Sequence, residues 1–260
     1  MGAPWRGALS VDFIGRVVAW FADPANWSGA DGIPARLGEH AVLSVIPLVI
    51  AVGVALPVGA WIGHTGRAAN LVINIANVGR AVPSLAILAV STMLLQATLV
   101  EVGLRAVASE VSTIIAMIAL AVPPILTNTY VGITGVDDDL VEAGRGMGMR
   151  GGQVLRLVEL PVALPVILVG IRTAAVQVVA TATLGAVFAT GGLGRYIIDG
   201  IAQRRHDEVF AGALLVALLS IMTELLFTAV QRRATSPGLR GEDAEAALTA
   251  QGTAGRQLAT

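Results

Sequence analysis

The sequence predicts an all-α, multi-pass membrane protein with five spanning helices, and two observations predict it. Hydrophobic residues make up 55% of the 260 residues and charged residues only 13%, about half the charged share of a soluble domain. The apolar residues are also grouped into runs that can each supply the ~20 helical residues needed to cross roughly 30 Å of hydrocarbon. We therefore expect lipid, rather than water, to surround most of this chain.

The spanning helices are expected where the apolar runs lie, at residues 41–62, 71–96, 111–133, 161–189 and 210–230. Prolines occur inside or beside most of these runs, at Pro47, Pro57, Pro83, Pro123, Pro124, Pro161 and Pro165. Lipid-embedded helices tolerate proline when neighbouring groups satisfy the freed carbonyls. The 30 glycines also let helix backbones approach closely. We expect kinked helices that pack tightly.

The segments on either side of the runs differ in character. Residues 1–38 lack the basic start and cleavage site of a signal peptide, and we expect an extracytoplasmic N-terminal segment. An amphipathic helix at residues 11–21 would lie in the membrane interface, with one apolar face made of Val11, Ile14, Val17, Val18 and Phe21. Residues 39–233 form the predicted membrane domain. Residues 234–260 turn polar and are expected to be a flexible cytoplasmic tail.

Arginines in the short loops predict the orientation, because Lys and Arg favour the cytoplasmic side. One side of a five-span topology receives Arg67, Arg145, Arg150, Arg156, Arg232 and Arg233. The other side receives the N-terminal segment and the loop at residues 190–209, whose three arginines are accompanied by Asp199, Asp207 and Glu208. We expect the N-terminus outside and the C-terminus inside the cell.

Composition also excludes several classes of function. The net charge of −1 offers no basic surface for nucleic acid. Without cysteine there is no disulfide, thiol chemistry or cysteine metal site. His40, His64 and His206 share no metal-ligand spacing, and neither a Ser-His-Asp set nor a phosphate-binding Gly-Lys-Ser/Thr motif is present. We therefore expect no catalytic residue, no metal and no cofactor.

The loop between the third and fourth runs carries the most specific pattern. Asp139 and Glu142 have the spacing of a capping box, which predicts a short helix starting near Leu140. Gly144, Gly146 and Gly148 would each destabilise that helix by about 1 kcal/mol relative to alanine. Small side chains there leave room for a partner's groove to close over the backbone, so the helix is interpreted as a docking element.

Glu142-Ala143-Gly144, then Gly148, and then Val158-x-Leu160-Pro161 resemble the EAA loop of permease subunits in binding-protein-dependent ATP-binding cassette (ABC) importers. Gly144 stands where the family usually has alanine, and Val158 where it has isoleucine. The resemblance implies that the short helix is a coupling helix, with Glu142, Ala143, Gly144 and Gly148 docking an ATPase and Leu160 and Pro161 turning into the next span. A Glu-Ala-Gly triplet alone is common in cytoplasmic loops.

The same resemblance implies a fold and partners. The fold is the five-helix core of the type I (MetI-like) importers in the cell inner membrane. The partners are an ABC ATPase subunit that hydrolyses ATP on a separate chain, a second permease subunit in a homo- or heterodimer, an extracytoplasmic solute-binding protein and membrane lipid. The chain itself is then a non-catalytic membrane subunit.

A narrower resemblance, in segments between residues 81 and 229, is to the osmoprotectant branch, which imports glycine betaine, carnitine, choline or proline betaine. It rests on residues 82–86, 128–133, 146–149, 158–161, 170–174 and 191–194. Permeases for methionine, phosphonates or alkanesulfonates share the EAA loop and fold and remain alternatives. An ion-coupled secondary carrier would need carboxylates in several spans and only Glu224 is available. A membrane scaffold would need no polar residue such as Arg172.

Ionisable and polar side chains in the spans are candidates for the transport pathway, because a charge in hydrocarbon costs several kcal/mol unless it pairs or reaches water. These candidates are Arg80, Asn128, Tyr130, Arg172 and Glu224. Arg80 and Glu224 equally fit side chains that extend to the interface, and Asn128 and Tyr130 fit bonding between helices. For Arg172 we expect a partner on another helix, with Glu224 one possibility.

Selection of a quaternary ammonium solute by this chain alone is not expected. Aromatic residues amount to 4%, too few for a tight aromatic cage, so selection is expected in a separate binding protein. The surface predicted to dock that protein is formed by the loop with Gly192, Gly194, Arg195, Asp199, Arg204 and Arg205. The alternative is that these residues form an ordinary cluster of solvated charges with no docking role, because such a cluster would have the same composition.

Overall fold

The computed structural model describes residues 11–72, 74–75, 82–104, 107–188 and 190–234. The predicted candidate Arg80 and the predicted tail, apart from its first residue, lie outside the described residues. Five described helices are long and apolar enough to cross a membrane. They are α2 (Ile33–Thr65), α4 (Ser84–Glu101), α5 (Ala108–Thr134), the helical run Gly151–Phe188 that contains α8 (Leu160–Gly185), and α10 (His206–Ala234).

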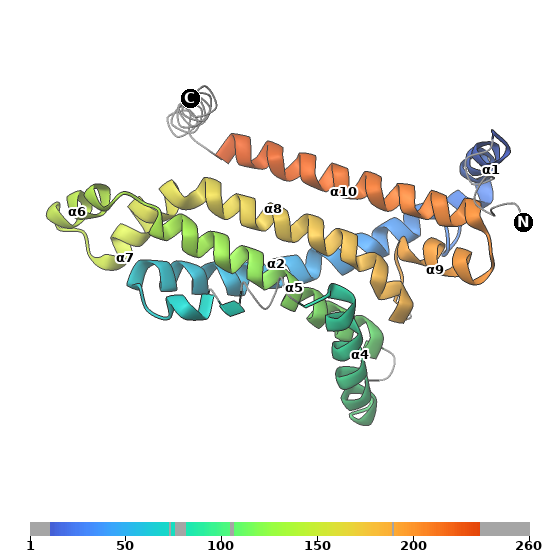
Figure 1. The fold of residues 1–260 in the computed structure, drawn as a ribbon, viewed down its shortest axis with the longest axis horizontal. Helices are drawn as coiled ribbons and strands as arrows, with labels where there is room; N and C mark the ends of the chain where they lie inside the picture. Colours follow the sequence, from blue (N-terminus) through green and yellow to red (C-terminus); the bar gives the residue numbers. More distant parts are fainter. Residues whose placement is uncertain (1–10, 73, 76–81, 105–106, 189, 235–260) are drawn as a thin grey trace, which may run out of the picture.

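The long helices α2, α5, α8 and α10 run side by side along the molecule (Figure 1). α5 packs against both α2 and α8, and the apolar core lies among these three helices. The buried side chains of this core are small or medium-sized: Ala51, Ala55, Ile62, Val72, Met117, Ala121, Ile125, Leu126, Ala174, Val178 and Ala182. Small residues at the contacts bring the backbones close enough for van der Waals attraction to hold helices together in lipid.

Gly170 marks a close approach of α8 to α5. A Cβ placed on Gly170 would lie 2.5 Å from Asn128 Cβ and 2.8 Å from the carbonyl oxygen of Pro124. Prolines also lie inside α2, α5 and α8, at Pro47, Pro57, Pro123, Pro124 and Pro165, as the sequence predicts for packed membrane helices.

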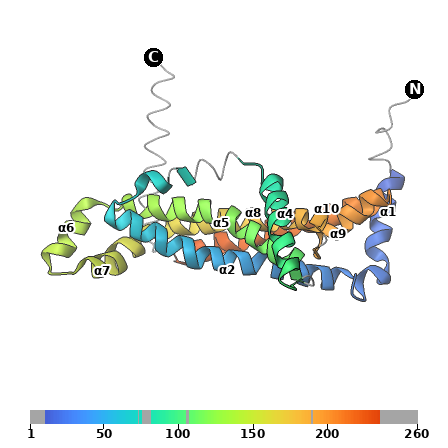
Figure 2. The ribbon, with the colours of Figure 1, turned by 90° about the horizontal axis from the view of Figure 1, so that it is seen from below.

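The second spanning helix differs from its predicted bounds. It was expected at residues 71–96, whereas α4 begins at Ser84 and continues to Glu101. Pro83 explains the start, because it cannot donate a helical hydrogen bond and disfavours the helical conformation of Val82. α4 projects away from the other long helices (Figure 1) and runs across their direction (Figure 2). Leu88 and Thr92 are its buried residues.

Short helices occupy the two ends of the molecule. α6 (Asp138–Gly146) and α7 (Gly151–Val154) lie at one end, whereas α1 (Val11–Ala22) and α9 (Gly194–Ala202) lie at the other. The last turn of α10 lies near the start of α8, because Gln231 Nε2 donates to the carbonyl of Pro165 at 3.3 Å. The termini of the described chain are therefore at opposite ends, as an odd number of spans requires.

The amphipathic N-terminal helix is present as α1, and it also packs against α10. Phe13 and Val17 are buried, whereas Ile14 and Val18 are exposed. The ring of Phe13 packs edge-on against Phe210 of α10, with centroids 5.6 Å apart. Part of the apolar surface of α1 is therefore covered by α10, and Ile14 and Val18 stay exposed.

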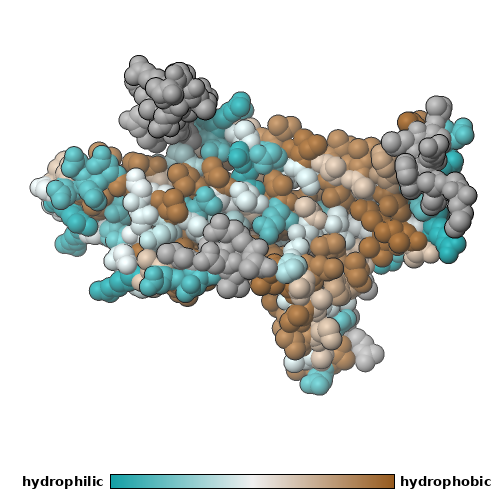
Figure 3. All heavy atoms as spheres, viewed as in Figure 1, coloured by the Kyte–Doolittle hydropathy of each residue, from teal (hydrophilic) through white to brown (hydrophobic). Residues whose placement is uncertain are grey.

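Apolar side chains cover α4 and much of α10, whereas hydrophilic ones gather at the α6 end and around α1 (Figure 3). The exposed apolar residues of α10 include Leu214, Leu218, Ile221, Met222, Leu225 and Leu226. An exposed apolar surface between two polar ends is the distribution expected of a protein surrounded by lipid.

Candidate functional site

The first candidate site is the α6 end, where the predicted docking loop lies. The short helix exists but begins earlier than predicted, at Asp138 rather than near Leu140. Its cap is Asp137, whose side chain accepts the backbone N–H of Asp139 at 2.9 Å, and not Asp139 itself. Three successive aspartates compete for this role, and the extended backbone of Asp137 (φ −58°, ψ 130°) selects it.

The three glycines of the loop have three different environments. Gly144 is buried, and a Cβ there would meet Val158 and Val154 of this same chain at 3.5 and 3.7 Å. Gly146 faces open space. Gly148 adopts φ +85°, a left-handed conformation that reverses the chain after α6. Side chains of this same chain therefore cover Gly144, whereas Gly146 and Gly148 add no side chain to the outer side of the loop.

An exposed apolar stripe runs along the outer side of α6. Leu140 and Met147 are 47% and 73% exposed, and exposed Ala143 lies between them at positions three and four residues away. Glu142, next to Ala143 in the sequence, is also exposed. Leu140 and Met147 were not among the predicted docking residues, although the spacing i, i+3, i+7 of Leu140, Ala143 and Met147 indicates one helical face.

The predicted turn at Leu160 and Pro161 is wrong. The chain runs as one helix from Gly151 to Phe188, and Leu155–Glu159 adopt π-helical geometry within it. The backbone N–H of Leu160 bonds to the carbonyl of Leu155, five residues earlier. Pro161 has no N–H to donate, and the wider π turn absorbs the break without ending the helix.

A polar pocket of about 420 Å³ lies between α6 and the ends of the membrane helices. Its walls come from the ends of α2 and α5, from α6 and from the π segment. The lining includes five ionisable side chains, His64, Asp138, Glu142, Arg145 and Glu159. His64 Nδ1 lies 2.7 Å from Glu159 Oε2, joining the last turn of α2 to the π segment.

The pathway candidates do not gather in one place. Arg172 on α8 has the predicted partner on another helix: its Nε lies 3.4 Å from Glu224 Oε1, and its Nη1 donates to Thr228 Oγ1 at 3.2 Å. Asn128 donates to the carbonyl of Pro124 in its own helix at 2.8 Å. Tyr130 packs against the apolar core.

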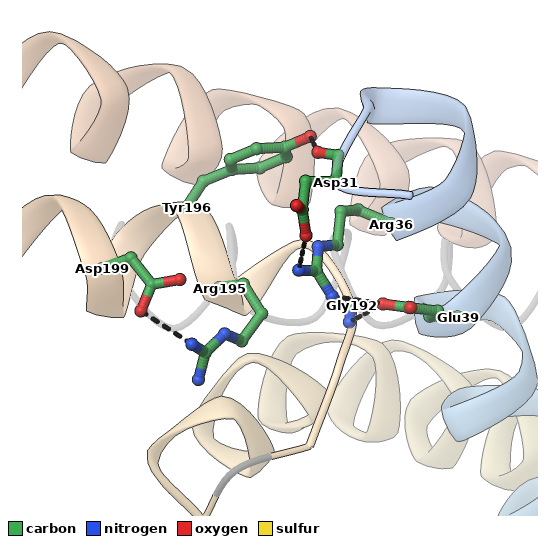
Figure 4. A network of polar contacts seen from close by, with 7 residues as sticks. All are labelled: Asp31, Arg36, Glu39, Gly192, Arg195, Tyr196 and Asp199. Carbon is green, nitrogen blue, oxygen red and sulfur yellow. Dashed lines mark hydrogen bonds and ion pairs between the residues drawn. The ribbon is translucent and has the colours of Figure 1, made fainter. Parts of the chain in front are cut away.

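The second candidate site lies at the opposite end, where Glu39 joins α2 to the loop before α9 (Figure 4). Glu39 Oε2 accepts the backbone N–H of Gly192 at 2.7 Å and Nη1 of Arg36 at 2.9 Å. Arg36 also pairs with Asp31, whose carbonyl accepts the hydroxyl of Tyr196 at 2.7 Å. We name these five residues the Glu39 network.

Tyr196 contributes to this network as a neutral donor. Burial raises the pKa of its phenol to about 12, so the hydroxyl keeps its proton at any physiological pH. Its ring packs edge-on against Trp20, with centroids 5.3 Å apart. The network is thereby closed on one side by aromatic rings from α1 and α9.

The residues predicted to dock a binding protein differ in burial: two are buried, two are half-buried and two are exposed. Gly192 and Gly194 are buried. A Cβ on Gly194 would lie 2.4 Å from the carbonyl oxygen of Thr183, and Gly192 has φ +91° beside His40. Arg195 pairs with Asp199 at 2.9 Å, and Arg205 pairs with Glu208 at 2.8 Å. Arg204 is exposed with φ +58°.

Replacing Glu39 by alanine should destabilise this end of the protein. The Gly192 N–H would lose its acceptor and Arg36 one of its two carboxylates, a loss of about 1–2 kcal/mol. We expect a lower melting temperature in detergent, measured by intrinsic fluorescence. Glu39→Gln, which keeps an acceptor for Gly192, should lose less, and Glu101→Ala on exposed α4 should lose nothing. Equal melting of all three variants would contradict the assignment.

Five apolar helices, a short exposed helix at one end and a polar, arginine-containing loop at the other define a multi-pass membrane transport subunit of the importer permease class. A family model for the inner membrane component of binding-protein-dependent transport systems matches residues 55–236. The chain belongs to this family and is an inner-membrane protein.

Relatives and solved structures agree with this assignment. The chain is 38% identical over 206 residues to the glycine betaine/carnitine/choline transport system permease protein OpuCB of Bacillus subtilis (strain 168), covering 79% of this chain and 90% of that protein. It is 37% identical to the carnitine transport permease protein OpuCB of Listeria monocytogenes, covering 78% and 88%. A structure of the MetNI methionine ABC transporter superposes with a TM-score of 0.67 at 20% identity, covering 82% of this chain and 99% of that chain, which confirms the predicted MetI-like fold.

Proposed function

We propose that this chain is the permease subunit of an ATP-driven importer and that α6 is its coupling helix, docking an ATPase on a separate chain. The observation that carries the proposal is the exposed stripe of Leu140, Ala143 and Met147 beside Glu142, at the tip of an otherwise hydrophilic end. An exposed apolar stripe with a polar rim is typical of a protein interface. The chain then hydrolyses nothing itself.

Osmoprotectants are the proposed solutes, taken up with the help of a binding protein. Relatives at 37–38% identity carry the names of glycine betaine, carnitine and choline permeases. In this proposal the half-buried Arg195 and Asp199 and the exposed Arg204 and Arg205 receive the binding protein, while the buried Gly192 and Gly194 shape the loop. The α6 end faces the cytoplasm and the α9 end faces outward, in keeping with the arginines of the loops.

The pathway is proposed to pass between two permease subunits, either two copies of this chain or a copy and a different chain. Arg172 and Glu224 are its candidate lining: their side chains are 28% and 46% exposed in the single subunit, an expensive arrangement in lipid. Asn128 and Tyr130 are proposed to contribute through α5. Residues 11–22 remain an interfacial helix in this proposal.

Uptake by a reconstituted complex tests the proposed function. The chain is co-expressed with candidate ATPase and binding-protein subunits from the same genome, reconstituted into proteoliposomes, and supplied with radiolabelled glycine betaine, choline or carnitine. We expect ATP-dependent accumulation of at least one solute that requires the binding protein. ATP-dependent uptake of methionine in place of these solutes would overturn the solute class, and uptake driven by an ion gradient without ATP would overturn the importer itself.

A further inference from the structure

We propose that His64 and Glu159 are positioning residues that make the first spanning helix move together with the docking loop. The inference rests on the proposed function of α6 as the ATPase-docking helix. It adds a specific route by which a displacement of α6 reaches α2, carried by side chains outside the docking surface.

The contact between His64 and Glu159 is largely buried, unlike an ion pair on the protein surface. The Glu159 side chain is 6% exposed and the His64 side chain 17% exposed, with Nδ1 and Oε2 2.7 Å apart. A carboxylate buried to this degree is costly unless it is hydrogen-bonded. Separating the two helices would leave Glu159 without its described partner, so the pair resists separation.

His64 is also held from its other side. A Cβ on Gly151 would lie 3.3 Å from Nε2 of His64, so the imidazole sits against the first residue of the helical run that follows the loop. Glu159, at the end of the π segment, contacts the opposite ring nitrogen. The imidazole at the end of α2 therefore lies against Gly151 and contacts Glu159, the first and last residues of the segment 151–159.

The same segment carries α6. Gly144 is buried against Val154 and Val158, which precede Glu159 on the segment. A force on α6 therefore reaches Val154 and Val158 by direct contact, then Glu159 through one helical turn, and then α2 through His64. Packed side chains and hydrogen bonds between rigid helices are the physical means of such coupling.

Breaking the pair should lower the number of solute molecules transported per ATP without releasing the ATPase. In the reconstituted system with radiolabelled glycine betaine, choline or carnitine, we expect Glu159→Leu to lower this ratio at least fivefold while the ATPase co-purifies in unchanged amount. Glu159→Gln keeps a hydrogen-bonding group toward either imidazole tautomer and should stay within twofold of the wild type. His64→Leu should resemble Glu159→Leu, and the double variant should be no worse than either single one.

The absence of cysteine from the chain permits a second test that does not depend on tolerance of leucine. A His64→Cys/Glu159→Cys protein should transport poorly per ATP until a short bifunctional thiol reagent joins the two positions, which should restore the ratio. The same reagent should have no effect on either single-cysteine protein. Loss of transport on cross-linking would show that the two elements must separate and would overturn the proposal.

The two proposals fail in different ways. If the wild-type complex shows no ATP-dependent uptake or does not retain an ATPase, the proposed function fails. If the wild type couples hydrolysis to uptake but Glu159→Leu and His64→Leu keep its ratio, only the role of this pair fails.

Discussion

Replacing Glu142 by lysine should lower ATP-driven solute uptake at least tenfold while leaving membrane insertion intact. Glu142 is exposed on α6, the proposed docking helix, and a reversed charge at a docking surface costs several kcal/mol when it faces a like charge. Lysine would also repel Arg145, three residues further along the same helix. The measurement is uptake in vesicles together with the amount of ATPase that co-purifies.

Two matched variants separate docking from folding in this prediction. Glu142→Gln keeps the shape and should lose less uptake than Glu142→Lys. Glu101→Lys places the same charge reversal on exposed α4, away from the loop, and should leave ATPase association unchanged. Normal uptake by Glu142→Lys would remove the docking role from α6.

Gly170→Ala should destabilise the permease by about 1–3 kcal/mol, the cost of overpacking a tight contact. The added Cβ would lie 2.5 Å from Asn128 Cβ and 2.8 Å from the Pro124 carbonyl oxygen. Neither atom is the end of a flexible side chain, so α5 and α8 would have to separate. The expected result is a lower melting temperature in detergent and less monodisperse protein, with a larger loss for Gly170→Leu.

The control for this prediction is another glycine in a spanning helix. Gly53 in α2 has nothing within 4 Å of the position that a Cβ would take, and Gly53→Ala should not lower the melting temperature. If Gly170→Ala melts like Gly53→Ala, then the close crossing of α5 and α8 is not a determinant of stability.

Elements with a local signal were predictable from the sequence. Apolar runs located all five spans because length and hydropathy are properties of a segment. The pairing of Arg172 with Glu224 was also within reach, because a charge in a span needs a partner and few are available. The short helix of the docking loop was expected from its acidic start, with an error of two residues in its cap.

Features decided by tertiary contact were not predictable. Glu159 is the unassigned residue between Val158 and Leu160 in the docking-loop motif, and the sequence says of His64 only that it shares no metal-ligand spacing with the other histidines. Nothing local connects two residues 95 positions apart. The packing of α1 on α10 likewise depends on Phe210, far along the chain. The exposure of Leu140 and Met147 is the exception, since their periodicity was visible in the sequence.

The first spanning helix has a polar anchor at each end. Near its start Glu39 holds the Gly192 loop, and in its last turn His64 holds the π segment. α2 is one helix of 33 residues, about 50 Å long at 1.5 Å per residue. In the proposed function, an axial displacement of α2 at the α6 end would therefore be passed to the loop that is proposed to dock the binding protein. Variants at either anchor should therefore share a phenotype, although their side chains never meet.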